Sequence, residues 1–149
     1  MDSPVLYRES FTIRGSDFER GGNAAANVKQ VMKELEIAPA VIRRLSIANF
    51  EAEMNVIMYA DEGVMELTIE PDAVRVVLAD RGPGIPDIQL AMQEGYSTAT
   101  AEMRARGFGA GMGLPNIKRN TDSFEIESTP GVGTTLRYAV SLSPADGSR

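Results

Sequence analysis

The chain of 149 residues contains no cysteine and no histidine. Without cysteine, disulfides and thiolate chemistry are excluded. Without histidine, the chain itself has no histidine metal ligand, no histidine general base and no histidine that accepts a phosphoryl group. No apolar run is long enough to cross a membrane, so we expect no membrane segment. The net charge of -6 argues against the basic surface that a nucleic-acid partner needs.

The first residues, Met1-Asp2-Ser3-Pro4, lack the basic start and apolar stretch of a signal peptide, which favours a cytoplasmic location. The length and the ordinary composition predict one domain with a hydrophobic core over residues 1–142. Residues 143–149 are small and polar, so we expect them to form a disordered tail.

Hydrophobic periodicity predicts an α+β fold. Strands that are linked by hairpins, with helices on one face, make a two-layer α/β sandwich around a mainly antiparallel sheet. Ser16 and Glu19 have capping-box spacing, which predicts that a helix begins at Ser16. The predicted elements are a strand over 5–13, helices over 16–36 and 40–60, strands over 65–70 and 74–80, helices over 86–93 and 114–122, and a hairpin of 123–128 with 134–141.

Glu51 and Asn55 lie four residues apart in the second predicted helix, so they share a face with Ile47, Met54 and Met58. A carboxylate and an amide at the edge of a core cost free energy unless they have partners. An Asn oxygen suits Mg²⁺, and a Glu beside a γ-phosphate would accept the proton of an attacking hydroxyl. In the alternative interpretation, both side chains lie just beside the apolar stripe and are solvated.

Asp80 ends a predicted strand, and Gly82 and Gly84 follow it at once. An ionised carboxylate at this place would accept a hydrogen bond from an exocyclic amine such as adenine N6. Glycines there would let the backbone approach a flat ring closely. The alternative is a tight turn with an Asp cap, since Asp, Gly and Pro are all turn residues.

Four alternating glycines precede the predicted helix that starts near Leu114-Pro115. Such a loop lets backbone N–H groups and the helix dipole face phosphate oxygens. It is not a P-loop, because no Gly-Lys-Ser/Thr follows, and its spacing is not that of the dinucleotide fingerprint. A loop without a ligand is the alternative. The polar segment 97–106 before it is predicted to be a lid over a nucleotide. The glycines are Gly107, Gly109, Gly111 and Gly113.

Four motifs occur in one order, and together they resemble a known superfamily. Glu51-x-x-x-Asn55, Asp80-x-Gly82-x-Gly84, Gly109-x-Gly111-x-Gly113 and Gly133-Thr134 resemble the N, G1, G2 and G3 boxes of the GHKL ATPase/kinase superfamily, which has the Bergerat fold. The resemblance covers roughly residues 43–140. Segments 80–88, 94–98 and 113–119 look most like the small serine kinases of bacterial partner switching, which are anti-sigma factors and stressosome switch kinases.

This resemblance implies roles for particular residues and two cofactors, ATP and Mg²⁺. Glu51 would be the general base, Asn55 the Mg²⁺ ligand and Asp80 the adenine contact. The rest of the nucleotide pocket would comprise Gly82, Gly84, Ile85, Gly109, Gly111, Gly113, Leu114 and Thr134.

The function so implied is an ATP- and Mg²⁺-dependent serine/threonine protein kinase that phosphorylates a STAS-domain antagonist in a partner-switching pathway. The alternative is an anti-sigma factor or nucleotide-gated binding module that sequesters a sigma factor or a PP2C-type phosphatase with little or no catalysis. A histidine-kinase catalytic domain would need an acceptor histidine from another chain, and a gyrase-like or Hsp90-like ATPase would need a transducer domain. The resemblance also implies a homodimer, formed through the region of the first strand.

Overall fold

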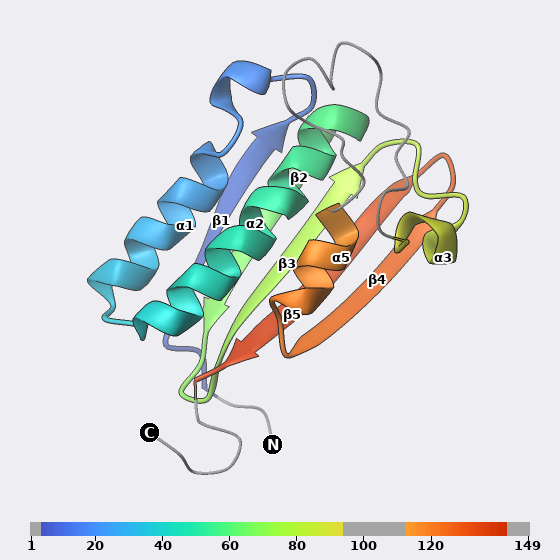
Figure 1. Cartoon of the computed structure of the whole chain (residues 1–149). Helices are drawn as coiled ribbons and strands as arrows, with labels where there is room; N and C mark the ends of the chain where they lie inside the picture. The colour runs from blue at the N-terminus through green and yellow to red at the C-terminus, as the bar shows by residue number, and fades with distance from the viewer. Residues whose placement is uncertain (1–3, 94–112, 143–149) are drawn as a thin grey trace.

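The computed structural model describes residues 4–93 and 113–142, and in this part of the chain five strands form one antiparallel sheet in the order β1-β2-β3-β5-β4 (Figure 1). The strands are β1 (Tyr7–Arg14), β2 (Glu62–Ile69), β3 (Ala73–Arg81), β4 (Ser123–Thr129) and β5 (Gly133–Ser141). The helices are the 3₁₀ helix η1 (Phe18–Arg20), α1 (Asn23–Glu34), α2 (Pro39–Tyr59), α3 (Ile88–Ala91) and α5 (Gly113–Arg119).

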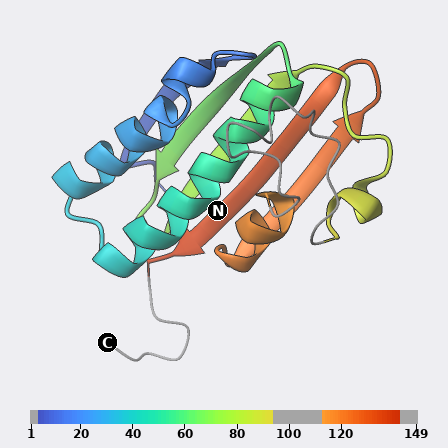
Figure 2. The ribbon, with the colours of Figure 1, turned by 45° about the horizontal axis from the view of Figure 1, so that its top comes forward.

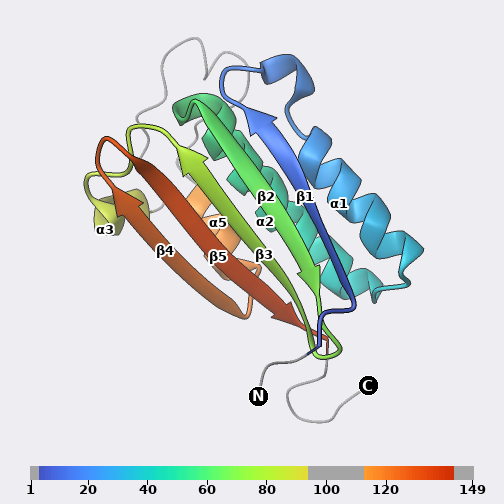
Figure 3. The same ribbon diagram turned by 180° about the vertical axis from the view of Figure 1, so that it is seen from behind.

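The helices α1, α2 and α5 cover one face of the sheet, with α2 between the other two (Figures 1 and 2). Seen from behind, the opposite face carries no helix among the described residues (Figure 3). This arrangement confirms the predicted two-layer α+β sandwich. No helix in residues 4–93 or 113–142 combines the length and the apolar character needed to cross a membrane.

The core lies between α2 and the central strands. On the sheet side, Leu67 stands opposite Val76, and Val76 stands opposite Tyr138, so these three side chains form one row under the helices. On the helix side, Leu45 and Ala52 are completely buried. Facing apolar rows of this kind remove large areas from water, at about 25 cal/mol for each Å², which explains why α2 lies across the middle of the sheet.

The prediction for α2 was correct in extent and partly wrong in orientation. The helix begins at Pro39 and ends at Tyr59, close to the predicted span. Ile47, however, is 40% exposed, whereas Ala48 and Ala52 are fully buried. The buried stripe is therefore rotated relative to the predicted one, and Glu51 and Asn55 lie half-buried at its edge.

The predicted capping box at Ser16 was wrong. Ser16 has a φ of +64°, which is left-handed, whereas an N-cap residue has an extended backbone. Its N–H donates to the carbonyl of Ile57, 2.7 Å away, so packing against α2 determines its conformation. Only the short η1 follows, and α1 begins later, at Asn23.

The other predicted elements are present, with small shifts at their ends. The helix predicted over 114–122 is α5 and ends at Arg119, because Asp122 already pairs with β5 through a bond from its N–H to the carbonyl of Ala139, 2.8 Å away. The helix predicted over 86–93 is the shorter α3, capped by Asp87. The predicted lid, 97–106, and the predicted tail, 143–149, lie outside the described residues.

Candidate functional site

The first part of the site lies between α2 and the start of α5. The side chains of Glu51 and Asn55 project from α2, half-buried. A Cβ atom added to Gly113 would lie 3.4 Å from Asn55 Oδ1 and 3.7 Å from Glu51 Oε1. The structure therefore brings these three predicted residues together, and a larger side chain at position 113 would cover both oxygens.

Asn116, one turn further along α5, was not predicted as a site residue. Its Nδ2 donates to Glu51 Oε2, 3.0 Å away, and its Oδ1 accepts from Arg119 Nη1, 2.8 Å away. The only sequence signal was its place three residues after Gly113, since that spacing returns a side chain to nearly the same helix face.

The second part of the site lies where β3 ends beside the start of β5. Asp80 Oδ1 accepts a hydrogen bond from the backbone N–H of Thr134, 3.0 Å away. Burial raises the pKa of Asp80, while the hydrogen bond from Thr134 acts in the opposite direction. The bond orients the carboxylate through one oxygen, and the other oxygen is suited to accept from a donor on a ligand.

A pair of hydroxyl groups extends this part of the site. Ser128 Oγ lies 2.9 Å from Thr134 Oγ1 and accepts from the backbone N–H of Ile85, 2.6 Å away. Ser128 was not predicted, although it stands directly opposite Thr134 in the register of β4 and β5. Its hydroxyl connects the segment after β3 to the hairpin that carries Thr134.

The glycines after Asp80 let the chain pack against the hairpin between β4 and β5. Gly84 has a φ of +77°, and a Cβ atom there would lie 2.6 Å from the carbonyl oxygen of Thr129. Gly82 N–H donates to the carbonyl of Val132, 3.0 Å away. A Cβ atom at Gly133 would lie 2.0 Å from the carbonyl oxygen of Asp80. These contacts hold the segment after β3 against the hairpin and so keep Asp80 beside Thr134.

The remaining predicted site residues fall into two groups. Leu114 is buried in the hydrophobic core, at 7% exposure, and it fixes the start of α5 against α2. Gly109 and Gly111 lie outside the described residues.

A depression of about 350 Å³ contains none of the predicted site residues. Its deepest carboxylate, that of Glu53, already accepts the backbone N–H groups at the start of α1. The depression is lined by Thr12, Ile13, Arg14, Asp17, Arg20, Asn23, Ala24, Glu53 and Ile57.

The chain is similar to one protein family and to several known proteins. Residues 40–144 match the model of the histidine kinase-, DNA gyrase B- and HSP90-like ATPases. The serine/threonine-protein kinase RsbT of Bacillus subtilis is 33% identical over 113 residues, which are 73% of this chain and 79% of that protein. The anti-sigma F factor of Caldanaerobacter subterraneus is 35% identical over 64% of this chain and 67% of its own. The anti-sigma F factor of Bacillus subtilis is 27% identical over 80% of this chain and 83% of that protein.

The family match includes α2, the end of β3, α5 and the last hairpin, which are the elements that carry the two parts of the site. The chain therefore belongs to the family of histidine kinase-, DNA gyrase B- and HSP90-like ATPases. Membership in this ATPase family implies that the chain binds ATP.

Proposed function

We propose that this protein is an ATP- and Mg²⁺-dependent serine/threonine protein kinase of a bacterial partner-switching pathway, and that it phosphorylates a STAS-domain antagonist. The observation that carries the proposal is the half-buried pair of Glu51 and Asn55 beside Gly113. A relative that is 33% identical is named a serine/threonine-protein kinase, which supports the same reaction class.

Asp80 would recognise the adenine ring. Its Oδ1 is occupied by the N–H of Thr134, 3.0 Å away, so Oδ2 would accept from the exocyclic amine. The Thr134 hydroxyl, which contacts Ser128 Oγ at 2.9 Å, would lie beside the ring. The turn through Gly82 and Gly84 and the half-buried Ile85 would form a wall of the pocket.

Asn55 would hold the metal. Its Oδ1 lies 3.4 Å from the place that a Cβ atom on Gly113 would occupy, and an amide oxygen is a ligand type that Mg²⁺ accepts. When bound, Mg²⁺ neutralises negative charge on the transferred phosphoryl group. The residues present at this edge of α2 therefore fit such an ion.

Glu51 would be the general base. Its Oε1 also faces Gly113, and a carboxylate there can accept the hydroxyl proton of a substrate serine or threonine. Most of the catalytic effect in phosphoryl transfer comes from positioning and electrostatics. A half-buried base on a long, well-packed helix provides such positioning.

A nucleotide-gated binding module is the second candidate. It is favoured by the relatives named anti-sigma F factor, and it would sequester a sigma factor or a PP2C-type phosphatase. Binding of ATP would then order the surface without phosphotransfer. The two candidates differ in whether Glu51 is needed for activity while nucleotide binding stays intact.

The proposed assembly is a homodimer in the cytoplasm, paired through the region of β1. This strand is an edge of the sheet, and an edge strand presents unpaired backbone groups to a second chain. We propose neither a nucleic acid nor a membrane as a partner.

The test is phosphotransfer from Mg-ATP to candidate STAS-domain proteins, measured by intact mass. With the parent chain, we expect one phosphate to be added to a serine or threonine of the substrate. With Glu51→Gln, this phosphate should be absent although the affinity for ATP is unchanged. Asn55→Ala should weaken Mg²⁺-dependent ATP binding. Glu62→Gln changes an exposed glutamate of β2 and serves as the matched control. Full activity of Glu51→Gln would refute its role as the base, and ATP binding without any phosphotransfer would favour the binding module.

A further inference from the structure

We infer that Asn116 is a positioning residue for Glu51: it holds one carboxylate oxygen so that the other receives the substrate proton. This inference rests on the proposed role of Glu51 as general base. It is carried by the hydrogen bond from Asn116 Nδ2 to Glu51 Oε2, 3.0 Å long, which joins α5 to α2 across 65 residues of sequence.

The orientation of the Asn116 amide follows from its two neighbours. A guanidinium only donates hydrogen bonds, and an ionised carboxylate only accepts them. Arg119 Nη1 lies 2.8 Å from one end of the amide, so this end must be the oxygen Oδ1. The nitrogen Nδ2 therefore faces Glu51, and a flipped amide would place two acceptors together and two donors together.

The bond to Asn116 distinguishes the two oxygens of Glu51. Oε2 accepts from the amide, whereas Oε1 lies on the side of Gly113, 3.7 Å from the place of a Cβ atom there. Asn55 Oδ1, the proposed metal ligand, is 3.4 Å from the same place. Oε1 and the proposed metal ligand thus both border the place of that Cβ atom, and a substrate hydroxyl would meet Oε1 there.

The chemical step then has a defined direction. The hydroxyl oxygen of the substrate forms a bond to the γ-phosphorus while the bond from that phosphorus to the β–γ bridging oxygen breaks. The hydroxyl proton moves to Glu51 Oε1, and ADP leaves with the bridging oxygen. Asn116 neither gains nor loses a proton, so its part is to hold Glu51 in one rotamer.

Core packing holds α5 in place, and a positioning residue needs such a fixed helix. Ile117 is completely buried, and Leu114 is 7% exposed. The end of the helix is closed by Asn120 Nδ2, which donates to the carbonyl of Asn116, 2.8 Å away. The half-buried Asn116 therefore projects from a helix that the core holds in place.

The decisive variant is Asn116→Asp, which has nearly the same shape and can still accept from Arg119 but cannot donate to Glu51 when ionised. Asn116→Ala removes both bonds, and Lys118→Ala, the control, changes an exposed side chain of the same helix. We expect kcat for phosphotransfer from Mg-ATP to fall about tenfold to hundredfold in both Asn116 variants, because hydrogen bonds to charged groups are among the stronger ones. KM for ATP and the ADP affinity should stay within about twofold, and Lys118→Ala should keep kcat.

Wild-type kcat in Asn116→Asp would overturn the inference, and so would a rise in KM for ATP with kcat unchanged, which would place Asn116 in nucleotide binding. If Glu51→Gln keeps activity, the proposed base itself is wrong. If Glu51→Gln loses activity and the Asn116 variants do not, only the positioning role is wrong.

A second measurement needs no substrate. The side-chain amide resonance of Asn116, assigned by its loss in Asn116→Ala, should shift in Glu51→Gln and stay in place in Glu62→Gln. An unshifted resonance in Glu51→Gln would contradict the hydrogen bond on which the inference depends.

Discussion

Asp80, the proposed adenine contact, carries a cost to stability. It is half-buried at the end of β3, and burial raises its pKa although the N–H of Thr134 donates to it. A raised pKa in the folded state means that this group favours folding at low pH. That contribution is lost as the pH rises through the folded-state pKa of Asp80. At neutral pH the ionised carboxylate therefore lowers the stability of the protein without nucleotide.

We predict that Asp80→Asn loses ATP binding and gains stability. The Asn oxygen can still accept from Thr134, so its NH₂ group would face the adenine amine, donor against donor. The affinity for ATP, measured by calorimetric titration, should fall about a hundredfold or more. The Tm of the nucleotide-free protein should rise. Unchanged ATP affinity would refute the adenine assignment, and a lower Tm would contradict the unfavourable burial of the charge.

Asn116 and Ser128 show why some residues of the site were missed. Both are ordinary polar residues in the sequence, and each acquires its role from a partner 65 or 43 residues away. Glu51, Asn55, Asp80 and Thr134 were predicted because each belongs to a spaced motif. Gly113 and Asn55 do lie together, whereas the nucleotide and metal assignments of these residues stay predictions.

At the scale of secondary-structure elements, the start of α1 depends on a side chain from α2. Glu53 is 2% exposed, and its carboxylate accepts from the backbone N–H groups of Gly22, Ala24 and Ala25 at distances of 3.0, 3.2 and 2.9 Å. The first N–H groups of a helix have no partner within the helix, and the helix dipole favours a negative charge there. Glu53 therefore replaces the cap that was wrongly predicted at Ser16.

We predict that Glu53→Gln lowers the free energy of unfolding by about 2 to 4 kcal/mol, because its NH₂ group would face the N–H groups of Gly22 and Ala24 and leave them without an acceptor. Urea unfolding followed by circular dichroism measures this change. Glu19→Gln alters an exposed glutamate of η1 and should stay within about 0.5 kcal/mol of the parent. Equal stability of Glu53→Gln and Glu19→Gln would show that Glu53 does not cap α1.

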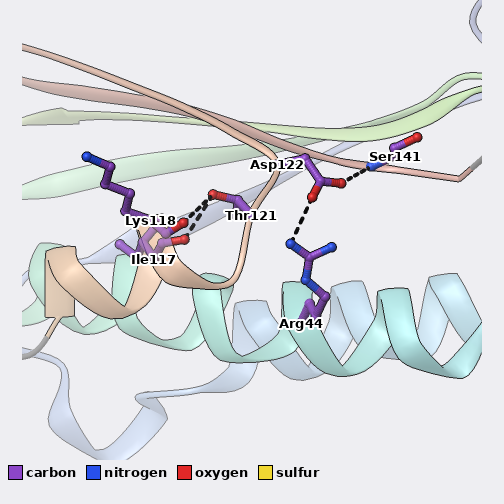
Figure 4. A network of polar contacts seen from close by, with 6 residues as sticks. All are labelled: Arg44, Ile117, Lys118, Thr121, Asp122 and Ser141. Carbon is purple, nitrogen blue, oxygen red and sulfur yellow. Dashed lines mark hydrogen bonds and ion pairs between the residues drawn. The ribbon is translucent and has the colours of Figure 1, made fainter. Parts of the chain in front are cut away.

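At the scale of the whole molecule, a polar network joins the helical layer to the sheet (Figure 4). Asp122 Oδ1 accepts from Arg44 Nη2 on α2, 2.9 Å away, and its Oδ2 accepts from the N–H of Ser141 on β5, 2.7 Å away. The hydrogen bond from Arg44 is the main cause that lowers the pKa of Asp122. Thr121 closes the preceding helix by donating to the carbonyl of Ile117.

We predict that Asp122 makes the free energy of unfolding depend on pH in the acid range. Its pKa is lowered in the folded state, so its contribution is present above the ordinary Asp pKa of about 3.9 and is lost as the pH falls through the lowered value. Because the pair is partly exposed to solvent, the difference in the free energy of unfolding between the parent and Asp122→Asn should be within about 1 kcal/mol at pH 7 and should shrink below about pH 4.

Urea unfolding at pH 7 and at pH 3 tests this dependence. Asp72→Asn, in the exposed turn between β2 and β3, is the matched control and should follow the parent at both pH values. A stability difference for Asp122→Asn that persists unchanged at low pH would contradict the electrostatic origin of the effect.

The sequence by itself determined the family, the two-layer fold, the kinase class and most element spans. Local periodicity shows which face of a strand or helix is apolar, as for Met65, Leu67 and Ile69 in β2, and such patterns need no knowledge of distant residues. Motif spacing likewise indicates a nucleotide site, because the types and the order of the residues are enough to recognise the motifs.

Only the tertiary structure decided which polar groups meet. Three contacts join residues that lie far apart in the sequence: the capping of α1 by Glu53, the bond from Asn116 to Glu51 and the contact of Ser128 with Ile85. The buried face of α2 was also decided by packing, since Ile47 lies outside it and Ala48 inside. The physical reason is that a polar side chain takes whichever partner the fold brings within about 3 Å, and the sequence pattern does not contain that distance.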